Sequence, residues 1–275
     1  MNKERMYVII THTLLIIGSC IMVFPFLWML LTSFKTVTEA TAINPFRVFP
    51  MEWKTENFVE AINQSNFIKL YFNTFSMIAI NVVCAIIFSS MAGFAFARLN
   101  FPGRDFFFGL VLFQMMIPTQ IFIIPQYMMV DKLGARNTIF ALVFPGLVSA
   151  FGTFLLRQFF KGIPMELEQS AKIDGCNIFQ SFVRIMLPLV KSGLVALSIF
   201  TALFSFKNLM WPLIVNSSPD MATLSSALAK IQSAYSINYP RLMAASVLAI
   251  CPMILIYFIF QKQFMQSVTT SGLTM

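Results

Sequence analysis

The sequence has almost none of the groups that enzymes use for catalysis. It contains one histidine, His12, which lies early in a long apolar run and has no metal-ligand companions. It contains no G-x-x-x-x-G-K-[ST] phosphate-binding loop, and no Ser/His/Asp constellation is available because His12 is far from the Asp-bearing loops. The sequence therefore predicts no catalytic residue, no metal site and no cofactor. Such a chain cannot use ATP by itself in the usual way.

Charged residues are also scarce. Asp, Glu, Lys and Arg make up 11% of the 275 residues, whereas 58% of the residues are hydrophobic and 32 are Phe. This composition excludes a soluble globular domain with an ordinary surface and predicts an integral membrane protein embedded in a lipid bilayer. The net charge of +8 comes from basic residues in separated loops, so nucleic acid is not expected as a partner.

Cysteine is rare as well. The four cysteines form no CxxC pair, and three of them lie within apolar segments. We interpret them as packing residues rather than as metal ligands or a disulfide framework.

Long apolar runs predict the fold class. About 20 apolar residues cross the hydrocarbon core of a bilayer, and the runs predict an all-α, polytopic integral membrane protein with six transmembrane helices. The first run is longer than the core of a signal peptide, and no A-x-A-like cleavage site follows it, so we expect it to remain as a membrane helix. The expected spans are residues 7–34, 70–97, 106–130, 137–160, 189–215 and 242–263, within a single transmembrane domain over residues 1–275.

The distribution of Lys and Arg predicts the orientation. These residues are denser in the short segments that face the cytoplasm if the N-terminus is inside, whereas the opposite side contains the long segment 35–69. Because short cytoplasmic loops of membrane proteins are enriched in Lys and Arg, both termini are expected in the cytoplasm.

Polar side chains within the predicted spans are candidates for a substrate path. Prolines recur in the spans, and bent helices can enclose such a path. Asn81, Gln114 and Asn208 are candidates for its lining, although amides in membrane helices more often hydrogen bond to neighbouring helices.

Lys207 is the sharpest candidate among them. It lies inside the fifth predicted span, and no acidic residue lies in any of the spans. Such a charge is costly in a membrane. Two explanations remain open: Lys207 extends to the interface or pairs with a second subunit, or it faces a polar substrate cavity.

The segment 161–188 is the longest polar interruption in the C-terminal half. Pro164 suits the first position of a helix, where Glu166 and Glu168 would lie in the favourable first turn. Gly175 can take the left-handed conformation that ends a helix. Because ion-coupled transport normally needs carboxylates within the spans and these spans have none, the energy for any active transport must come from a partner.

A motif in this segment carries a resemblance to a known family. Glu168-Gln169-Ser170-Ala171-Lys172-Ile173-Asp174-Gly175, followed after nine residues by Ile185-Met186-Leu187-Pro188, resembles the E-A-A, D-G, I-x-L-P loop of the membrane permeases of bacterial ABC importers. Four further stretches resemble the carbohydrate-importer permeases related to the smaller membrane subunit of the maltose transporter: AGFAFARLNFPGRD, MIPTQIFIIPQYMMVDKLGARNT, WPLIV and MAASVLAICPMILIYFIFQKQF.

The resemblance implies a permease domain over residues 1–275 with a cytoplasmic coupling helix in the loop 161–188. It also implies a multi-pass protein of the cell membrane that pairs with a second permease, two cytoplasmic ATPase subunits and an external sugar-binding protein. The expected substrate is a carbohydrate, an oligosaccharide or a sugar derivative rather than an ion. The residues implied in ATPase coupling are Glu168, Gln169, Ser170, Ala171, Asp174 and Gly175.

The sequence also departs from the family pattern. The usual glutamate of E-A-A is Gln169 here, so coupling is expected to depend on helix shape more than on charge at this position. Glu168 is instead positioned to meet a basic group on the ATPase. A secondary transporter and a membrane scaffold remain as alternatives, but the first predicts intramembrane carboxylates and the second leaves the coupling-like loop unexplained.

Overall fold

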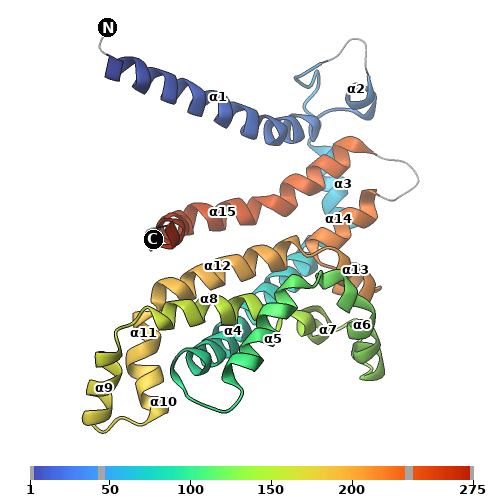
Figure 1. Cartoon of the computed structure of the whole chain (residues 1–275). Helices are drawn as coiled ribbons and strands as arrows, with labels where there is room; N and C mark the ends of the chain where they lie inside the picture. The colour runs from blue at the N-terminus through green and yellow to red at the C-terminus, as the bar shows by residue number, and fades with distance from the viewer. Residues whose placement is uncertain (1–2, 43–46, 233–237, 273–275) are drawn as a thin grey trace. The chain divides into compact units, whose positions relative to one another are not determined.

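The computed structural model describes residues 3–42, 47–232 and 238–272, and every regular element within these ranges is a helix (Figure 1). The prediction of an all-α fold is confirmed for this part of the chain. The elements are α1 (Lys3–Thr32), α2 (Val37–Thr41), α3 (Glu56–Gln64), α4 (Phe67–Arg98), α5 (Arg104–Met116), η1 (Thr119–Phe122), α6 (Ile123–Lys132), α7 (Ile139–Val143), η2 (Phe144–Gly146), α8 (Ala150–Lys161), α9 (Met165–Ile173), α10 (Ile178–Ser181), η3 (Phe182–Met186), α11 (Leu187–Leu189), α12 (Lys191–Lys207), α13 (Met210–Val215), η4 (Pro219–Met221), α14 (Leu224–Gln232) and α15 (Tyr239–Gly272).

Three helices are long and apolar enough to cross a membrane as continuous elements. They are the stretches Arg5–Thr32 of α1, Phe67–Arg98 of α4 and Tyr239–Phe258 of α15. Pro25 and Pro252 lie inside α1 and α15, which continue through them. Three further pairs of helices reach the required length only as bent pairs, so the described residues hold three candidate spans, or six if each bent pair is one span. The number six stays a prediction.

The predicted span 106–130 is broken rather than straight. It is divided between α5 and the stretch Thr119–Lys132, and the two turn by 99° with respect to each other. Ile117 has extended backbone, with ψ of 127°, and Pro118 follows it. Because proline disfavours the α conformation of the preceding residue, the helix ends before the proline.

The predicted span 137–160 is bent near its proline, and a second bend lies where the predicted loop 161–188 meets the predicted span 189–215. The stretches Ile139–Gly146 and Ala150–Lys161 meet at 48°, and Ile178–Leu189 and Lys191–Lys207 meet at 76°. Pro145 lies in η2 and Pro188 in α11, shortly before each bend. Proline has no N–H to donate to the preceding turn, which weakens the helix at these points.

By contacts along the chain, the protein divides into two compact units. The first comprises residues 1–67 and 227–256, and the second comprises residues 68–226 and 257–275.

The first unit contains a polar segment after α1 that is organised around Lys35 and Asn57. Lys35 is buried, with 1% of its surface exposed, and its Nζ donates to the carbonyl oxygen of Arg47 at 2.7 Å. The ammonium also lies 4.4 Å from the centre of the Trp28 ring, and burial lowers the pKa of Lys35. The Nδ2 of Asn57 donates to the carbonyl oxygens of Ser33 and Lys35 at 2.9 and 3.0 Å. These bonds hold the chain after α1 in a defined path.

In the second unit, small residues let α8 approach α4 and α12 closely. A methyl group at Gly152 of α8 would collide with Ser89 Oγ of α4, and one at Gly193 of α12 would lie 2.7 Å from the ring of Phe159. Small residues at helix contacts are typical of membrane proteins, where close van der Waals packing drives association. The bodies of α8 and α12 accordingly lie side by side (Figure 1).

A buried apolar cluster joins the same three helices to the polar segment that follows α8. Phe182 and Met186 of η3 pack with residues of α4, α8 and α12. The Phe94 ring lies 5.0 Å from the Phe182 ring and 5.6 Å from the Phe160 ring, measured between centroids. The buried members are Phe94, Leu156, Phe160, Phe182, Met186, Val190 and Leu197.

Candidate functional site

The polar segment 161–188 forms a helical hairpin built from α9 and the run α10, η3 and α11. Figure 1 shows α9 and α10 extending from the ends of α8 and α11. Pro164 has φ of −56° and ψ of 140°, so it precedes the first helical residue, Met165, instead of occupying the first helical position as predicted. Glu166 and Glu168 do lie in the first turn, where the positive end of the helix dipole favours their charge.

Gly175 makes the turn that ends α9. Its φ is +82°, in the left-handed region, as the sequence predicts. The N–H of Gly175 donates to the carbonyl oxygen of Lys172 at 3.1 Å, and the N–H of Cys176 donates to that of Ala171 at 2.9 Å. This pair of bonds is a Schellman motif, in which a left-handed residue closes the end of a helix. Asp174 is the last residue before it and is exposed.

The second arm of the hairpin begins with a reciprocal cap. The Asn177 side chain accepts from the N–H of Gln180 at 2.8 Å, and the Gln180 side chain accepts from the N–H of Asn177 at 3.0 Å. This capping box satisfies N–H groups that have no partner within the helix. The helix then widens into a π-helix, η3, whose Phe182 and Met186 enter the buried cluster. The hairpin is therefore anchored in the membrane helices through its second arm.

Glu168 lies in a buried position although it is charged. Only 7% of its surface is exposed, its Oε1 lies 3.5 Å from Nζ of Lys172, and its Oε2 has no hydrogen-bond partner among the described residues. It lines a groove of about 460 Å³ between the two arms, with Phe94, Lys172, Cys176, Asn177, Ile178, Phe179 and Ser181. The expected contact of Glu168 with a basic group on an ATPase stays a prediction, and such a group would meet it in this groove.

The other predicted coupling residues fall into two groups by exposure. Ala171 is buried, with 2% exposed, and lies three residues after Glu168 on the same face of α9. Gln169 and Ser170 are exposed, and Ser170 Oγ donates to the carbonyl oxygen of Glu166 at 2.9 Å. Ser170 thus satisfies its hydroxyl within α9, and Gln169 faces outward.

Helices α9 and α10 of the hairpin expose five large apolar side chains, two of which also line the groove between its arms. Met165, Leu167 and Ile173 of α9 and Ile178 and Phe179 of α10 are all exposed, and Ile173 is the most exposed at 86%. Sequence inspection missed this surface because the residues are scattered among charged ones. Exposed apolar side chains on a polar segment are candidates for contact with another molecule.

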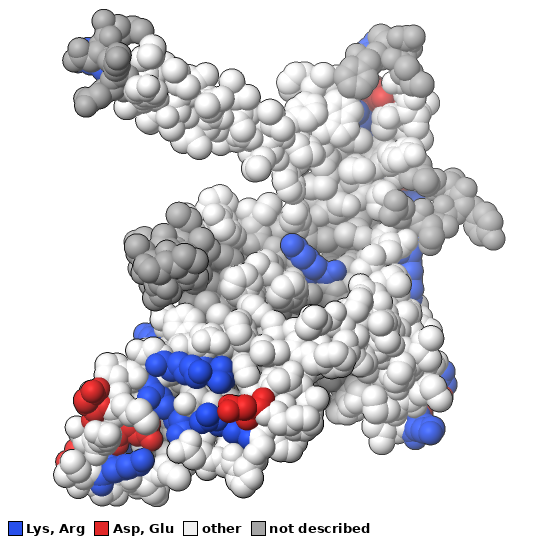
Figure 2. Space-filling view, viewed as in Figure 1, with Lys and Arg blue, Asp and Glu red and all other residues white. Residues whose placement is uncertain are grey.

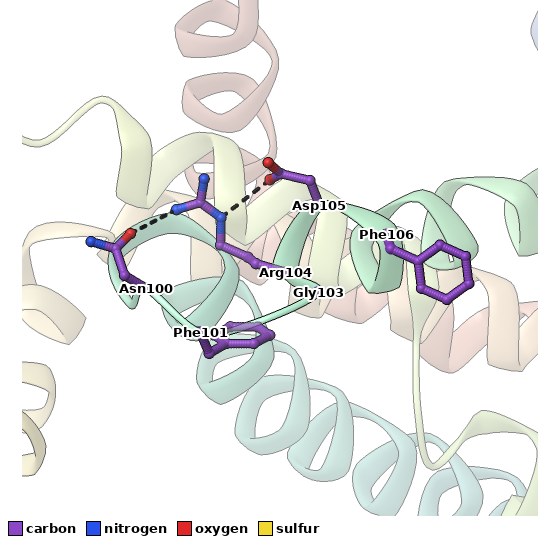
Figure 3. Close-up of a pocket in the computed structure, with 6 residues that line it drawn as sticks. All are labelled: Asn100, Phe101, Gly103, Arg104, Asp105 and Phe106. Carbon is purple, nitrogen blue, oxygen red and sulfur yellow. Dashed lines mark hydrogen bonds and ion pairs between the residues drawn. The ribbon is translucent and has the colours of Figure 1, made fainter.

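The loop between α4 and α5 forms a second hollow, of about 310 Å³, in the second unit. Figure 3 shows Arg104 between Asn100 and Asp105: its Nη1 donates to Asn100 Oδ1 at 3.2 Å and its Nε to Asp105 Oδ1 at 3.1 Å. Gly103 precedes α5 with φ of +77°. The charged side chains on the face drawn in Figure 2 gather over this loop and the hairpin of α9 and α10. Within the stretch AGFAFARLNFPGRD, Arg104 thus pairs with Asp105 and bonds to Asn100. The residues that line this hollow include no His, Cys or Ser that could act in catalysis.

Two arginines tie this region to the end of α8. Arg98 Nη2 donates to the carbonyl oxygens of Phe160, at 2.6 Å, and Ile163. These carbonyl groups lie at or beyond the end of the helix, where no intrahelical donor remains. Arg157 Nε donates to the carbonyl oxygen of Phe96 at 3.2 Å, and its guanidinium lies 3.8 Å from the centre of the Phe108 ring. Both contacts fix the base of the hairpin to α4 and α5.

Three of the four candidate path residues lie around the break that follows α12. Asn81 of α4 is buried, and its Nδ2 donates to Ser205 Oγ at 3.1 Å. Lys207 is the last residue of α12 and is exposed, and Asn208 has extended backbone. The carbonyl oxygen of Asn208 accepts from Ser225 Oγ at 2.9 Å.

Gln114 is not part of this arrangement. It lies exposed on α5, three residues before the break at Ile117, and no side-chain bond joins it to the α12 break in the described residues. Sequence inspection also missed Ser205 and Gly146. A methyl group at Gly146 would lie 2.6 Å from Asn81 Oδ1, so this glycine lets η2 approach the Asn81 amide.

The described residues hold no group of three or more His, Cys, Asp or Glu side chains that could bind a metal ion. The second unit presents two features that could contact other molecules: a hairpin with exposed apolar side chains, and a polar break between α12 and α13.

Comparison with known proteins relates the chain to membrane transport. The profile of the family described as "Binding-protein-dependent transport system inner membrane component" matches residues 85–270. The chain is 38% identical over 254 residues to the arabinooligosaccharides transport system permease protein AraQ of Halalkalibacterium halodurans, covering 92% of this chain and 91% of that protein. It is 30% identical over 272 residues to the diacetylchitobiose uptake system permease protein NgcG of Streptomyces coelicolor, covering 98% and 89%.

A solved structure shares the fold. A chain in the crystal structure of a bacterial ABC transporter involved in the import of the acidic polysaccharide alginate superimposes with a TM-score of 0.82 at 21% identity, covering 95% of this chain and 98% of that chain.

Proposed function

Because the chain belongs to the family of binding-protein-dependent transport system inner membrane components, we propose that it is the permease subunit of an ABC importer that forms, with a second permease, the translocation path for an oligosaccharide. The relatives that transport arabinooligosaccharides and diacetylchitobiose support a carbohydrate substrate. On this proposal the whole chain is one permease domain with six spans, and both termini lie in the cytoplasm.

The observation that carries the proposal is the anchored hairpin with an apolar outer surface. Its second arm places Phe182 and Met186 in the cluster formed with α4, α8 and α12, while Ile173 and Phe179 remain exposed. A partner that binds the exposed surface would thus be connected by direct packing to three helices of the membrane unit. Packed side chains transmit a displacement because protein interiors are close-packed.

We assign the partner on this surface as one of two cytoplasmic ATPase subunits. Residues 164–175 make the contact, Gly175 supplies the turn, and Ala171 and Glu168 support α9 from inside. Closure of the ATPase dimer then moves the hairpin, and the attached helices change the access of the path. ATP hydrolysis takes place in the partner, and an external sugar-binding protein delivers the carbohydrate.

A substitution of the most exposed apolar side chain of the hairpin tests this assignment. Ile173→Asp places a charge on the most exposed apolar side chain of the hairpin without filling any interior space. Loss of a central apolar contact costs about 2 kcal/mol or more, so the affinity of the membrane complex for its ATPase should fall at least about 30-fold. Co-purification with the tagged ATPase and carbohydrate-stimulated ATP hydrolysis in proteoliposomes measure the effect.

The matched control is Gln169→Glu, which adds a charge of the same sign at an exposed position of the same helix. Gln and Glu have similar helix propensity, so this variant should keep uptake and ATPase binding. Wild-type binding by Ile173→Asp, a large loss of transport in Gln169→Glu, or the absence of any associated ATPase would contradict the assignment.

A further inference from the structure

Lys207 lies at a level of the membrane unit where burial of a charged side chain in lipid is costly. It is the last residue of α12, and Lys191 is the first. At 1.5 Å per residue the two α-carbons are about 24 Å apart, which is less than the roughly 30 Å thickness of the hydrocarbon core. If Lys191 marks the inner edge of the core, Lys207 lies inside its outer part.

The backbone that follows Lys207 takes part in a polar contact at the break, but no counter-ion lies beside the ammonium among the described residues. One residue beyond Lys207, the carbonyl oxygen of Asn208 accepts from Ser225 Oγ, so the segment after α13 folds back to the level of the break. Two residues before it, on the opposite side of the helix, Ser205 Oγ accepts from Asn81. The end of a helix favours a cation, which helps α12 to tolerate the charge. No ion pair or hydrogen bond of the Lys207 ammonium occurs within the described residues, and the predicted spans contain no Asp or Glu.

Lys207 does not lie on the side of α12 that packs against α4. Successive residues of an α-helix are about 100° apart, so Lys207 lies about 200° from Ser205, which is buried against Asn81. Phe204, 66% exposed, lies near it on the same side of the helix. The ammonium is therefore presented on the free side of α12, next to the polar break.

We propose that Lys207 binds an anionic group, a carboxylate or a phosphate, on the transported carbohydrate. This inference rests on the proposed function and narrows the substrate from oligosaccharides in general to negatively charged sugars. A lysine offers three N–H donors, and a charge-assisted bond to an anion is about twice as strong as a neutral hydrogen bond. A charged residue within a membrane faces a cavity or a partner, and the passing substrate supplies the partner here.

The test begins with the binding protein of the assembled importer. Its thermal stability is measured with galactotriose, with trigalacturonate, with glucose 6-phosphate and with a wider set of neutral, carboxylated and phosphorylated sugars. The expected best ligand is a carboxylated or phosphorylated sugar, and the two arms distinguish these sources of charge. A neutral sugar as the best ligand overturns the inference and leaves the proposed function intact, whereas the absence of any carbohydrate ligand overturns both.

The second step measures uptake of the best ligand by the complete importer in proteoliposomes with wild type, Lys207→Met and Lys207→Arg. Lys207→Met should lower uptake efficiency at least about tenfold, and Lys207→Arg should stay within about threefold of wild type because it keeps the charge. Lys132→Met is the matched control: Lys132 is also the last residue of its helix and is exposed, and its loss should leave uptake unchanged.

Methionine is chosen because it suits a lipid-facing position better than lysine. If Lys207 only extends to the membrane interface, Lys207→Met assembles and transports as wild type does, and the inference is overturned. Failure of Lys207→Met to co-purify with the other subunits also overturns it, because that result assigns the lysine to pairing between subunits.

Discussion

Replacement of Gly175 by alanine isolates the contribution of one backbone conformation to the proposed attachment of the ATPase. Gly175 has φ of +82°, and a methyl group there would have no heavy atom within 4 Å. Alanine therefore causes no collision, and its whole cost comes from holding an L-residue in the left-handed region, about 1–2 kcal/mol. That cost opposes the two bonds of the Schellman motif, which close only with this φ.

The expected loss of ATPase binding follows from this cost. If the closed turn is the form that the ATPase binds, 1–2 kcal/mol lowers its population relative to open forms by a factor of about 5–30. The affinity falls by this whole factor if the open forms predominate in the variant and by less if the closed turn does, so titration of purified ATPase onto the solubilised membrane complex should show a loss of up to about 5–30-fold. Gly175→Asn should recover part of it, because asparagine tolerates the left-handed region better than alanine does.

Gly162→Ala is the matched control. Gly162 also follows a helix, but its φ is −73° and the nearest heavy atom to an added methyl group is 3.5 Å away. This variant should bind the ATPase as wild type does. Wild-type affinity in Gly175→Ala would refute the role of the turn, and equal losses in Gly175→Ala and Gly175→Asn would refute the conformational explanation.

Two further predictions concern the rest of the chain. Gly146→Ala should lower the free energy of unfolding of the complex by about 1–3 kcal/mol, seen as a lower melting temperature, because its methyl group would meet the Asn81 amide at 2.6 Å. Gly109→Ala is the control, since a methyl group there meets nothing within 4 Å. Equal melting temperatures of the two variants would disprove the close approach. Glu39 accepts from the N–H groups of Thr36 and Met51, and the Thr36 bond foremost lowers the pKa of its carboxyl. The stabilisation that the Glu39 carboxylate gives to this segment is therefore complete above the ordinary pKa near 4.3 and is lost as the pH falls through the lowered pKa. Hydrogen exchange of residues 36–42, corrected for intrinsic rates, should therefore accelerate in acid for wild type. Glu39→Gln should lose this pH dependence.

Local features of the hairpin 161–188 were predictable from sequence because they depend on a few neighbouring residues. The left-handed turn at Gly175 needs only a glycine after a helix-forming stretch, and it is found there. The burial of Glu168 was not predictable, because it depends on how α10 and Phe94 pack beside α9. A charged side chain in the first turn of a helix reads as exposed unless the neighbouring arm is known.

Hydropathy predicted where the apolar runs lie but not how their backbones turn. The run 106–130 is apolar on both sides of Ile117, so its composition does not reveal a 99° bend, and only Pro118 signals one. The contact of Asn81 with Ser205 joins residues 124 positions apart. No spacing rule within one helix brings such a pair together, so the sequence alone did not indicate Ser205 as the partner of Asn81.

The π-helix Phe182–Met186 gives a structural meaning to the nine residues that separate Gly175 from Ile185. A π-turn holds one residue more than an α-turn, so deletion of one residue here could restore regular helix. The same deletion would rotate every side chain on one flank by about 100° relative to the other and withdraw Phe182 or Met186 from the buried cluster. The length of this segment is therefore constrained by the rotation about the helix axis that directs Phe182 and Met186 into the cluster. During divergence, an insertion or deletion here would be tolerated only if the anchoring side chains changed position with it.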